Sequence, residues 1–252
     1  MSSAEPSQHE PGVGHSGASG GASWPASVEE LLGAQRELAR SRAPEWQPPT
    51  DAYAIGGCFA CFAREAQPPG ARNEPGWAAA AVALERRIVA RGLARGRAPA
   101  AYDPGLLALR EGPLLEAAVR ALARAPDVLL VNATGRDHPR RAGLALHLGA
   151  VIGVPTVGVT HRPLLAQGEW PSEERGARSL LVLDGETVGC WLRTRQRARP
   201  LAVHAGWRTG IETACSVVLA ATARMRAPEP LREARRLARV ARARERSVHG
   251  CS

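Results

Sequence analysis

The chain has 252 residues, of which 44% are hydrophobic and only 4% aromatic, so a single sizeable core must rest on aliphatic side chains. No segment reaches the roughly 20 apolar residues that span a bilayer, which excludes an integral membrane protein, and no apolar leader opens the chain. We therefore expect a cytoplasmic protein with reduced thiols and no membrane contact. The net charge of +9 favours a polyanionic partner, although all 33 basic residues are arginine, which indicates that part of the excess reflects a GC-rich genome.

The first half of the chain begins with a segment of low complexity. Residues 1–24 are rich in Gly and Ser and predict a disordered tail. A capping box of Ser27 and Glu30 then opens an amphipathic helix, and residues 51–59 have the pattern of a strand. The alanine-rich residues 77–96 fit either one helix or two antiparallel strands, and periodicity alone does not separate the two.

The middle of the chain predicts alternating helices and strands. Residues 103–126 should form a helix in two pieces, interrupted around Gly112-Pro113, because proline disfavours the helical conformation in the residue before it. The next three elements predict a right-handed parallel βαβ unit, with a strand at 127–132, a helix at 139–152 and a strand at 154–160.

The last third predicts a hairpin, a strand and two helices. The hairpin covers residues 179–194 and turns at Asp184-Gly185. A short strand follows, then a helix with Thr209 as its N-cap, and the arginine-rich end is expected to be helical. The expected organisation is a disordered tail at 1–24, one α/β domain at 25–230 and an arginine-rich helix or tail at 231–252.

Five segments carry motifs that occur together in one family. They are AYDPGLLALREGP (101–113), NATGRDHPRRAGLALHLG (132–149), GVPTVGVTHRPL (153–164), LRTRQRARPLAVHAGWR (192–208) and RAPEPLREA (226–234). In this order they resemble endonuclease V, a family that nicks nucleic acid near deaminated bases such as inosine, and the resemblance runs from about residue 27 to residue 236. It implies a ribonuclease H-like α/β fold, a mixed sheet flanked by helices in a single domain, with two strands at 77–96. It also implies Mg²⁺-dependent phosphodiester hydrolysis.

The resemblance carries over five catalytic positions, of which one keeps its acid. Glu111 is the glutamate of the Arg-Glu motif, whereas Cys58 and Asn132 stand where the family has aspartates on two strands. His161 replaces a lysine after the next strand, and Trp207 replaces the histidine of Gly-His-Arg. Glu111 and Asn132 are the remaining candidate metal ligands. They form a weak pair, because Mg²⁺ prefers several hard oxygen ligands and a thiolate at Cys58 would be soft.

Two further groups lie near these positions. Asp137 follows Asn132 in the next loop, but an acid just before a helix is more often a solvated cap. Cys61 shares the first strand with Cys58 at a spacing that points the two side chains to opposite faces, so they should not chelate one ion. Neither group is expected to restore a metal site.

The segments that contact substrate are better preserved. By resemblance, Tyr102-Asp103-Pro104-Gly105 is a wedge, in which an aromatic ring and a rigid turn separate the strand beside the altered base. The start of the helix expected at 139 offers backbone amides to a phosphate. The residues expected to contact nucleic acid are Tyr102, Pro104, Gly105, Gly135, His138, Arg140 and Arg141. On an extended strand, alternation would also align a cationic row of Arg193, Arg195, Arg197 and Arg199.

Three functions are consistent with these patterns. The preferred one is a diverged family member that binds DNA or RNA as a monomer, including single strands and strands with deaminated bases, with weak or no Mg²⁺-dependent hydrolysis. The first alternative is an active endonuclease that nicks DNA or RNA near inosine with Mg²⁺ and a compensating group such as Asp137. The second is a non-catalytic protein-interaction module, which predicts no salt-dependent binding of nucleic acid.

Overall fold

One mixed sheet organises the protein. The structure, a computed structural model, describes residues 23–63 and 68–249. Within these residues the sheet has eight strands in the order β3-β2-β1-β4-β5-β8-β7-β6. The strands are β1 (Ile55–Phe62), β2 (Pro75–Leu84), β3 (Arg87–Arg97), β4 (Val128–Val131), β5 (Thr156–Thr160), β6 (Arg178–Leu183), β7 (Glu186–Leu192) and β8 (Leu201–Ala205). β1, β4 and β5 run parallel, so their carboxyl ends meet at one edge of the sheet.

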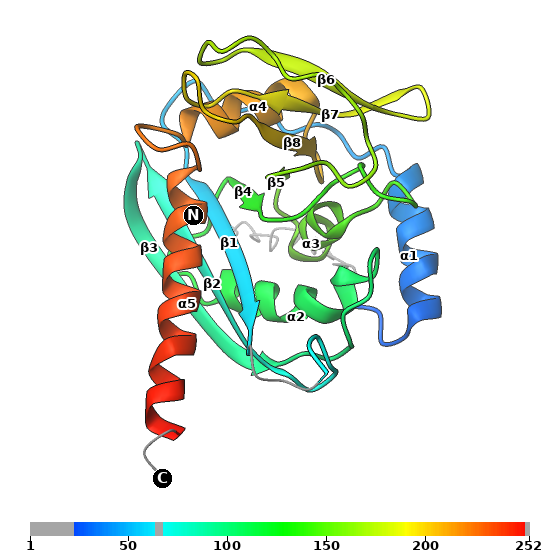
Figure 1. Ribbon diagram of the computed structural model, residues 1–252, viewed down its shortest axis with the longest axis vertical. Coiled ribbons are helices and arrows are strands. Elements are labelled where there is room, and N and C mark those ends of the chain that lie inside the picture. The colour runs from blue at the N-terminus through cyan, green and yellow to red at the C-terminus, as the bar shows by residue number, and fades with distance from the viewer. Residues whose placement is uncertain (1–22, 64–67, 250–252) are drawn as a thin grey trace, which may run out of the picture.

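Helices cover both faces of this sheet. They are α1 (Val28–Arg40), α2 (Leu107–Arg120), α3 (Leu144–Ile152), α4 (Ile211–Ala220) and α5 (Glu229–His249). α2 and α3 pack on one face, and α4 and α5 pack on the other (Figure 1). Leu, Val and Ala fill both cores, which confirms the aliphatic interior expected from the composition. Among the described residues, no helix is long and apolar enough to cross a bilayer.

The alanine-rich segment is confirmed as two antiparallel strands, β2 and β3. They are joined by Glu85 and Arg86, both in the left-handed region with φ of 47° and 65°, which is the backbone of a tight hairpin turn. Alanines 78–81 of β2 are fully buried, because helices cover the strand on both faces. Small side chains therefore allow the helices to lie close to the sheet.

Two glycines mark the closest approach of helices to strands. A Cβ added to Gly57 of β1 would lie 2.6 Å from the backbone N of Leu231 in α5. One added to Gly92 of β3 would lie 2.3 Å from the carbonyl O of Ala118 in α2. Both distances are far below van der Waals contact, so only glycine admits the helices at these points.

The arginine-rich end of the chain forms α5, which crosses β1 and β2 (Figure 1). Its buried Ala238 packs over Trp77 and Ala79 of β2. Two ion pairs tie it to β3, Arg91 with Glu233 at 2.7 Å and Arg95 with Glu245 at 2.9 Å. The boundary expected after residue 230 falls within the first turn of α5, so this segment covers a face of the sheet.

Two helices differ from the sequence expectation. The helix expected in two pieces is one helix, α2, with Pro113 inside it. Proline removes one N–H from the helix, and burial of Leu109, Leu114 and Leu115 on its core-facing side holds both halves in place. The helix expected from residue 139 begins at Leu144, since the preceding loop folds back and places Arg141 at a φ of 56°.

Trp24 belongs to the ordered fold and not to the expected tail. Its ring stacks on His147 with centroids 4.9 Å apart, and its Nε1 donates to Glu116 at 2.6 Å. Gly112 lies directly beneath, because a Cβ there would approach the ring to 2.2 Å. The predicted disordered tail is therefore corrected at its last two residues, and its remaining part, residues 1–22, lies outside the described residues.

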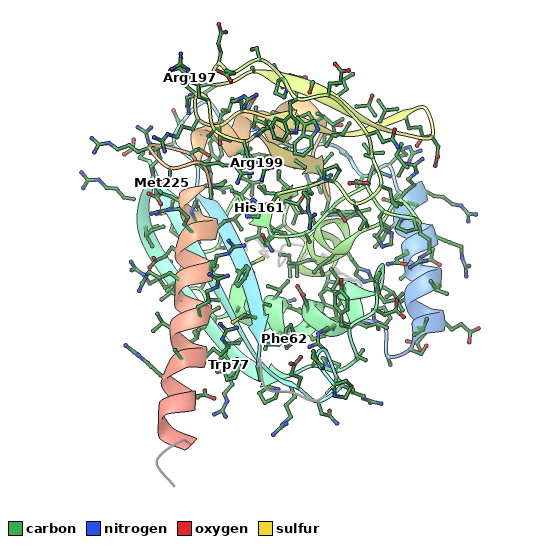
Figure 2. The ribbon with its side chains drawn as sticks, in the orientation of Figure 1. Phe62, Trp77, His161, Arg197, Arg199 and Met225 are labelled. Atoms are coloured by element: carbon green, nitrogen blue, oxygen red, sulfur yellow. A yellow bond between two sulfur atoms is a disulfide. The ribbon has the colours of Figure 1, made fainter. Side chains whose placement is uncertain are left out.

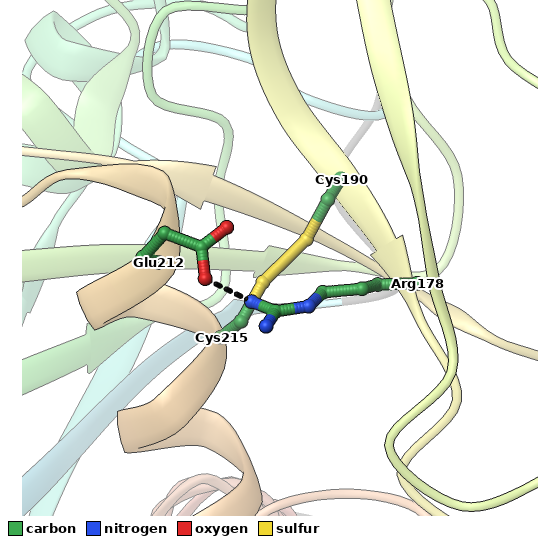
Figure 3. The surroundings of a disulfide bond; sticks show 4 residues. All are labelled: Arg178, Cys190, Glu212 and Cys215. Carbon is green, nitrogen blue, oxygen red and sulfur yellow. Dashed lines mark hydrogen bonds and ion pairs between the residues drawn. A yellow bond between two sulfur atoms is a disulfide. The ribbon is translucent and has the colours of Figure 1, made fainter.

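A disulfide joins Cys190 of β7 to Cys215 of α4 (Figure 3). This corrects the expectation of reduced thiols for these two residues, whereas Cys58 and Cys61 are free cysteines as expected, and Cys251 lies outside the described residues. The physical reason is packing, since both cysteines are buried in the same cluster where α4 covers the sheet. Beside them, Arg178 of β6 donates to Glu212 of α4, so α4 is connected to both strands of the β6–β7 hairpin.

Candidate functional site

Functional positions collect at the carboxyl edge of the three parallel strands. Cys58 of β1 pairs with Val131, the last residue of β4, and the chain bends at Asn132, where Ala133 N donates to the Val131 carbonyl O at 2.8 Å. His161 follows the end of β5 on the other side of β4. Phe59, Asn132 and His161, here called the strand-end site, line one small hollow that α5 closes with Leu231, Arg232 and Arg235.

Alternation along β1 places Cys58 and Phe59 on opposite faces of the sheet. Cys58 is fully buried under α2 and α3 in the same cluster as Val131, whereas Cys61 lies in the cluster under α5. The two thiols therefore point to opposite faces, as expected. Phe59 packs on the α5 side and lines the hollow with Asn132. Sequence spacing alone does not select Phe59, because packing sets the register between β1 and β4.

Glu111 of α2 approaches from the other face and is only partly charged at neutral pH. It keeps some exposed surface, yet burial of the carboxyl raises its pKa to about 7, which the neighbouring Arg110 opposes only in part. Arg110 is committed to a buried ion pair with Glu74 and lies 4.1 Å from the centre of the Phe62 ring. Burial, and then the nearness of Glu111, raises the pKa of the Cys58 thiol, so the sulfur stays protonated.

These donors do not fit Mg²⁺. The ion takes hard oxygen ligands in near-octahedral geometry, and the strand-end positions offer a neutral amide at Asn132, a protonated sulfur at Cys58 and an aromatic ring at Phe59. Within residues 23–63 and 68–249, no group of three or more His, Cys, Asp or Glu side chains is placed to hold a metal ion. The Arg235 guanidinium lies 4.9 Å from the Phe59 ring centroid, so the α5 side of the hollow is already cationic.

Asp137 is neither a solvated cap nor a ligand aimed at this hollow. It is fully buried and accepts three backbone N–H bonds, from Leu164 at 2.6 Å, Leu165 at 2.9 Å and Ala166 at 2.8 Å. The expected solvated role is therefore corrected. Asp137 fixes the loop that follows His161, and its oxygens are already used there.

The wedge loop is held through one carbonyl oxygen. Gly105, at a φ of 81°, accepts there from Gln35 Nε2 at 3.1 Å, His138 Nε2 at 3.1 Å and Arg140 Nη2 at 2.9 Å. Burial lowers the pKa of His138 to about 4, so its ring is neutral. His138 Nδ1 accepts from the Arg140 backbone N–H, which leaves the proton on Nε2. Tyr102 at the tip stays 57% exposed.

Arg140 and Arg141 lie in the loop ahead of α3, and their side chains bond to the protein. Arg140 holds the wedge as described, and Arg141 donates to Asp184 at 3.0 Å in the β6–β7 turn. A Cβ on Gly135 would lie 2.0 Å from the Ala205 carbonyl O, so this glycine lets the loop pack on β8. The expectation that these residues open a helix is corrected, because the loop continues to the N-cap at residue 143.

A second hollow, of about 350 Å³, lies between the wedge loop and the end of β4. Here called the base hollow, it is lined among others by Tyr102, Pro104, Asn132, Ala133, Thr134 and His138. Its surface is largely apolar with a few polar groups, which is typical of a ligand pocket. The structure thus brings the wedge residues and Asn132 to one cavity.

His161 lines both hollows and is neutral. Its Nδ1 lies 3.2 Å from Arg226 Nη1, and burial, followed by the charges of Arg226 and Arg235, lowers its pKa. It therefore does not supply the cation that a lysine would. Trp207 is not brought to this edge, because its carbonyl O accepts from Thr156 N at 2.9 Å at the amino end of β5.

A mixed sheet whose central parallel strands end at the site, with helices on both faces, defines a ribonuclease H-like α/β protein. Within that class, residues 50–236 match the family model of endonuclease V, and the chain belongs to the endonuclease V family.

Relatives and solved structures are similar to this chain along most of its length. Endonuclease V of Streptomyces coelicolor is 38% identical over 224 residues, which cover 87% of this chain and 93% of that protein. Endonuclease V of Methanopyrus kandleri is 37% identical over 221 residues, which cover 85% of this chain and 89% of that protein. The crystal structure of Streptomyces avermitilis endonuclease V superposes with a TM-score of 0.80 at 36% identity, covering 89% of this chain and 96% of that one.

Proposed function

We propose that this family member binds nucleic acid and has weak or no Mg²⁺-dependent phosphodiester hydrolysis. The observation that carries the proposal concerns the three positions where the resemblance places acids: of Cys58, Glu111 and Asn132 only Glu111 has a carboxyl, and the side chain near it is the buried, protonated thiol of Cys58. Arg235 beside the Phe59 ring supports it, because a divalent cation there would meet a guanidinium in place of a carboxylate. In this proposal Cys58 stands at the position of the family's first-strand aspartate, and its buried thiol lies near Glu111, whose charge helps to raise the pKa of that thiol.

The proposed ligand is a DNA or RNA strand with a deaminated base. The exposed Tyr102 ring can stack on a base without any metal, and the base hollow beside it offers space for one. Endonuclease V of Ciona intestinalis, 20% identical with a TM-score of 0.69, was crystallised with a 24mer DNA containing an inosine followed by a ribo-adenosine. We extend that class of ligand to this chain, acting as a monomer in the cytoplasm.

The test separates binding from cleavage. Labelled single- and double-stranded DNA and RNA, with and without inosine, are assayed for nicking in Mg²⁺ or Mn²⁺ and for binding in EDTA. We expect salt-dependent binding that weakens about tenfold in Tyr102→Ala, since stacking is worth about 1–3 kcal/mol per base, and no nicking above that of Glu111→Gln. Nicking that Glu111→Gln abolishes would refute the proposal. Absence of all binding would favour a protein-interaction module.

Two matched double variants test the place of Cys58. Cys58→Asp with Asn132→Asp puts a carboxylate near Glu111 and a second at the end of β4, whereas Phe59→Asp with Asn132→Asp puts the first of them on the α5 side of β1, beside Arg235. We expect only the Cys58 double variant to gain Mg²⁺ binding in a calorimetric titration. Mg²⁺ binding by the Phe59 double variant alone would move the aspartate position to Phe59.

A further inference from the structure

Trp170, in the loop between β5 and β6, presents an open aromatic face beside the strand-end site. The residue is 52% exposed, and its ring meets Trp191 edge to face with centroids 6.3 Å apart at 76°. Trp191 is buried and donates from Nε1 to the Gly168 carbonyl O at 2.9 Å. Trp170 is therefore supported at a fixed angle while much of its surface remains accessible.

A groove of about 710 Å³ connects Trp170 with the strand-end site. Its walls include His161, Arg162, Trp170, Trp191, Arg199 and Arg226, and it is called here the tryptophan groove. His161 also lines the strand-end hollow and the base hollow, so the three spaces meet at this side chain. His161 and Arg199 lie close together beside the amino-terminal part of α5 in Figure 2.

Three arginines give this groove a positive charge. No carboxylate of residues 23–63 and 68–249 lies within ion-pair distance of Arg162, Arg199 or Arg226. Arg226 is held rigidly, since it donates to the carbonyl O of Arg199 at 2.6 Å and of Pro200 at 2.8 Å. The Arg199 guanidinium lies 5.6 Å from the Trp170 ring centroid. An aromatic face and uncompensated cations therefore share one wall.

Other arginines in residues 193–199 have partners within the protein, unlike the three that line the groove. Arg193 is buried and donates to three backbone carbonyls, and Arg197 lies 3.6 Å from Glu173. Because β7 ends at Leu192, the cationic row expected over 193–199 does not form on a strand. Arg199 is the member of that row that lines the groove, which sets it apart from a general arginine excess.

We propose that the tryptophan groove binds a nucleotide of single-stranded nucleic acid that flanks the base in the base hollow. Its base would stack on Trp170, and its phosphates would pair with Arg162, Arg199 and Arg226. Stacking accepts any base, and a guanidinium matches a phosphate through two parallel hydrogen bonds. This inference rests on the proposed function and extends the contact surface beyond the family motifs, since the strand leaves the site past His161.

Affinity against strand length tests the groove. Inosine-containing single strands are lengthened one nucleotide at a time, first on one side of the inosine and then on the other, and binding is measured by fluorescence anisotropy in EDTA. Affinity should rise when the strand reaches the groove. Trp170→Ala should reduce that gain in affinity about tenfold, and Trp170→Phe should keep most of the gain. Abasic nucleotides in the added segment should reproduce the loss in the unaltered chain, because they keep the phosphate and lack the base.

Salt dependence tests the arginines. Arg199→Gln should lower the slope of log affinity against log salt by about 0.7 for long strands, the value for one phosphate contact on a single strand. Arg124→Gln is the matched control, because Arg124 is exposed in the turn between α2 and β4, at the amino end of the parallel strands. For Arg124→Gln, the slope of log affinity against log salt should equal that of the unaltered chain.

The outcomes distinguish this inference from the function on which it rests. Equal affinity of Trp170→Ala and the unaltered chain at every strand length would refute nucleotide binding in the tryptophan groove and leave the proposed function standing. Failure to bind any strand would overturn both. Nicking would overturn only the proposed function, because the groove is measured without metal. Trp170 and Arg199 are exposed, so the variants should fold, and their thermal unfolding checks this.

Discussion

Replacing Glu111 by Gln should stabilise the fold at alkaline pH. Burial raises the pKa of the Glu111 carboxyl from 4.5 to about 7, so over this interval the folded chain holds a proton that the unfolded chain has released. The free energy of unfolding therefore falls as pH rises through the interval, and each pKa unit is worth about 1.4 kcal/mol. The loss approaches about 3–4 kcal/mol above neutral pH, and an uncharged Gln does not incur it.

Urea unfolding at a series of pH values measures this difference. The variant and the unaltered chain should be about equally stable near pH 4, and the free energy of unfolding of Glu111→Gln should exceed that of the unaltered chain by about 3–4 kcal/mol near pH 8. Glu37→Gln, at an exposed position on α1, is the control, and its profile should follow that of the unaltered chain. Parallel profiles for Glu111→Gln and the unaltered chain would refute the reasoning.

Added Mg²⁺ extends the same assay. An ion held by Glu111 would favour the ionised carboxyl and so stabilise the unaltered chain at alkaline pH. Because the donors at the strand ends do not fit the ion, we expect no effect of Mg²⁺ on the free energy of unfolding near pH 8. Stabilisation by Mg²⁺ that disappears in Glu111→Gln would contradict the proposed loss of metal-dependent hydrolysis.

Three further predictions concern contacts around the site. Asp137→Ala should lower the free energy of unfolding by about 3–5 kcal/mol in urea titration, because three buried backbone amides lose a charged acceptor; a loss below about 1 kcal/mol would mean that water replaces it. Gln35→Ala should lower stability by only about 1 kcal/mol yet weaken oligonucleotide binding severalfold, because the wedge loop loses one of its supports; unchanged affinity would exclude that role. Reductant should lower the free energy of unfolding by about 3 kcal/mol, the value for a bridge across 25 residues, and Cys215→Ala should abolish this response; a response that persists in the variant would point to other thiols.

Local signals in the sequence account for much of the sheet. The Asp184-Gly185 turn predicts the β6–β7 hairpin, which the structure confirms with φ of 50° and 79° at these two residues. The parallel βαβ unit is also confirmed, because β4 and β5 pair in parallel around α3. For residues 77–96 the local pattern was ambiguous, and only the resemblance to the family indicated two strands. Alanine is compatible with both a helix and a strand, so pairing with distant strands determines which of the two this segment forms.

The positions of the site residues depend more on packing between helices, strands and loops than on local sequence pattern. Phe59 and Asn132 line one hollow because α5 packs over the ends of β1 and β4, which no short motif specifies. Gln35 was missed, although a polar residue one turn after buried Leu31 was an available signal of an internal partner. Asp137 could not be assigned, because its partners lie in a distant loop that only the folded chain brings near.

The tight fit between helices and inner strands influences which substitutions the chain can accept over generations. Alanines 78–81 are fully covered, and Gly57 and Gly92 meet helix backbone directly, so any added methylene would displace α2 or α5 at a cost of about 1–3 kcal/mol. Phe59 also packs against α5, whereas Asn132, just past the end of β4, is exposed and can be exchanged without moving a helix. The packing thus constrains the interior of the sheet tightly and the residue past the end of β4 little, so the fold itself does not dictate which side chain stands there.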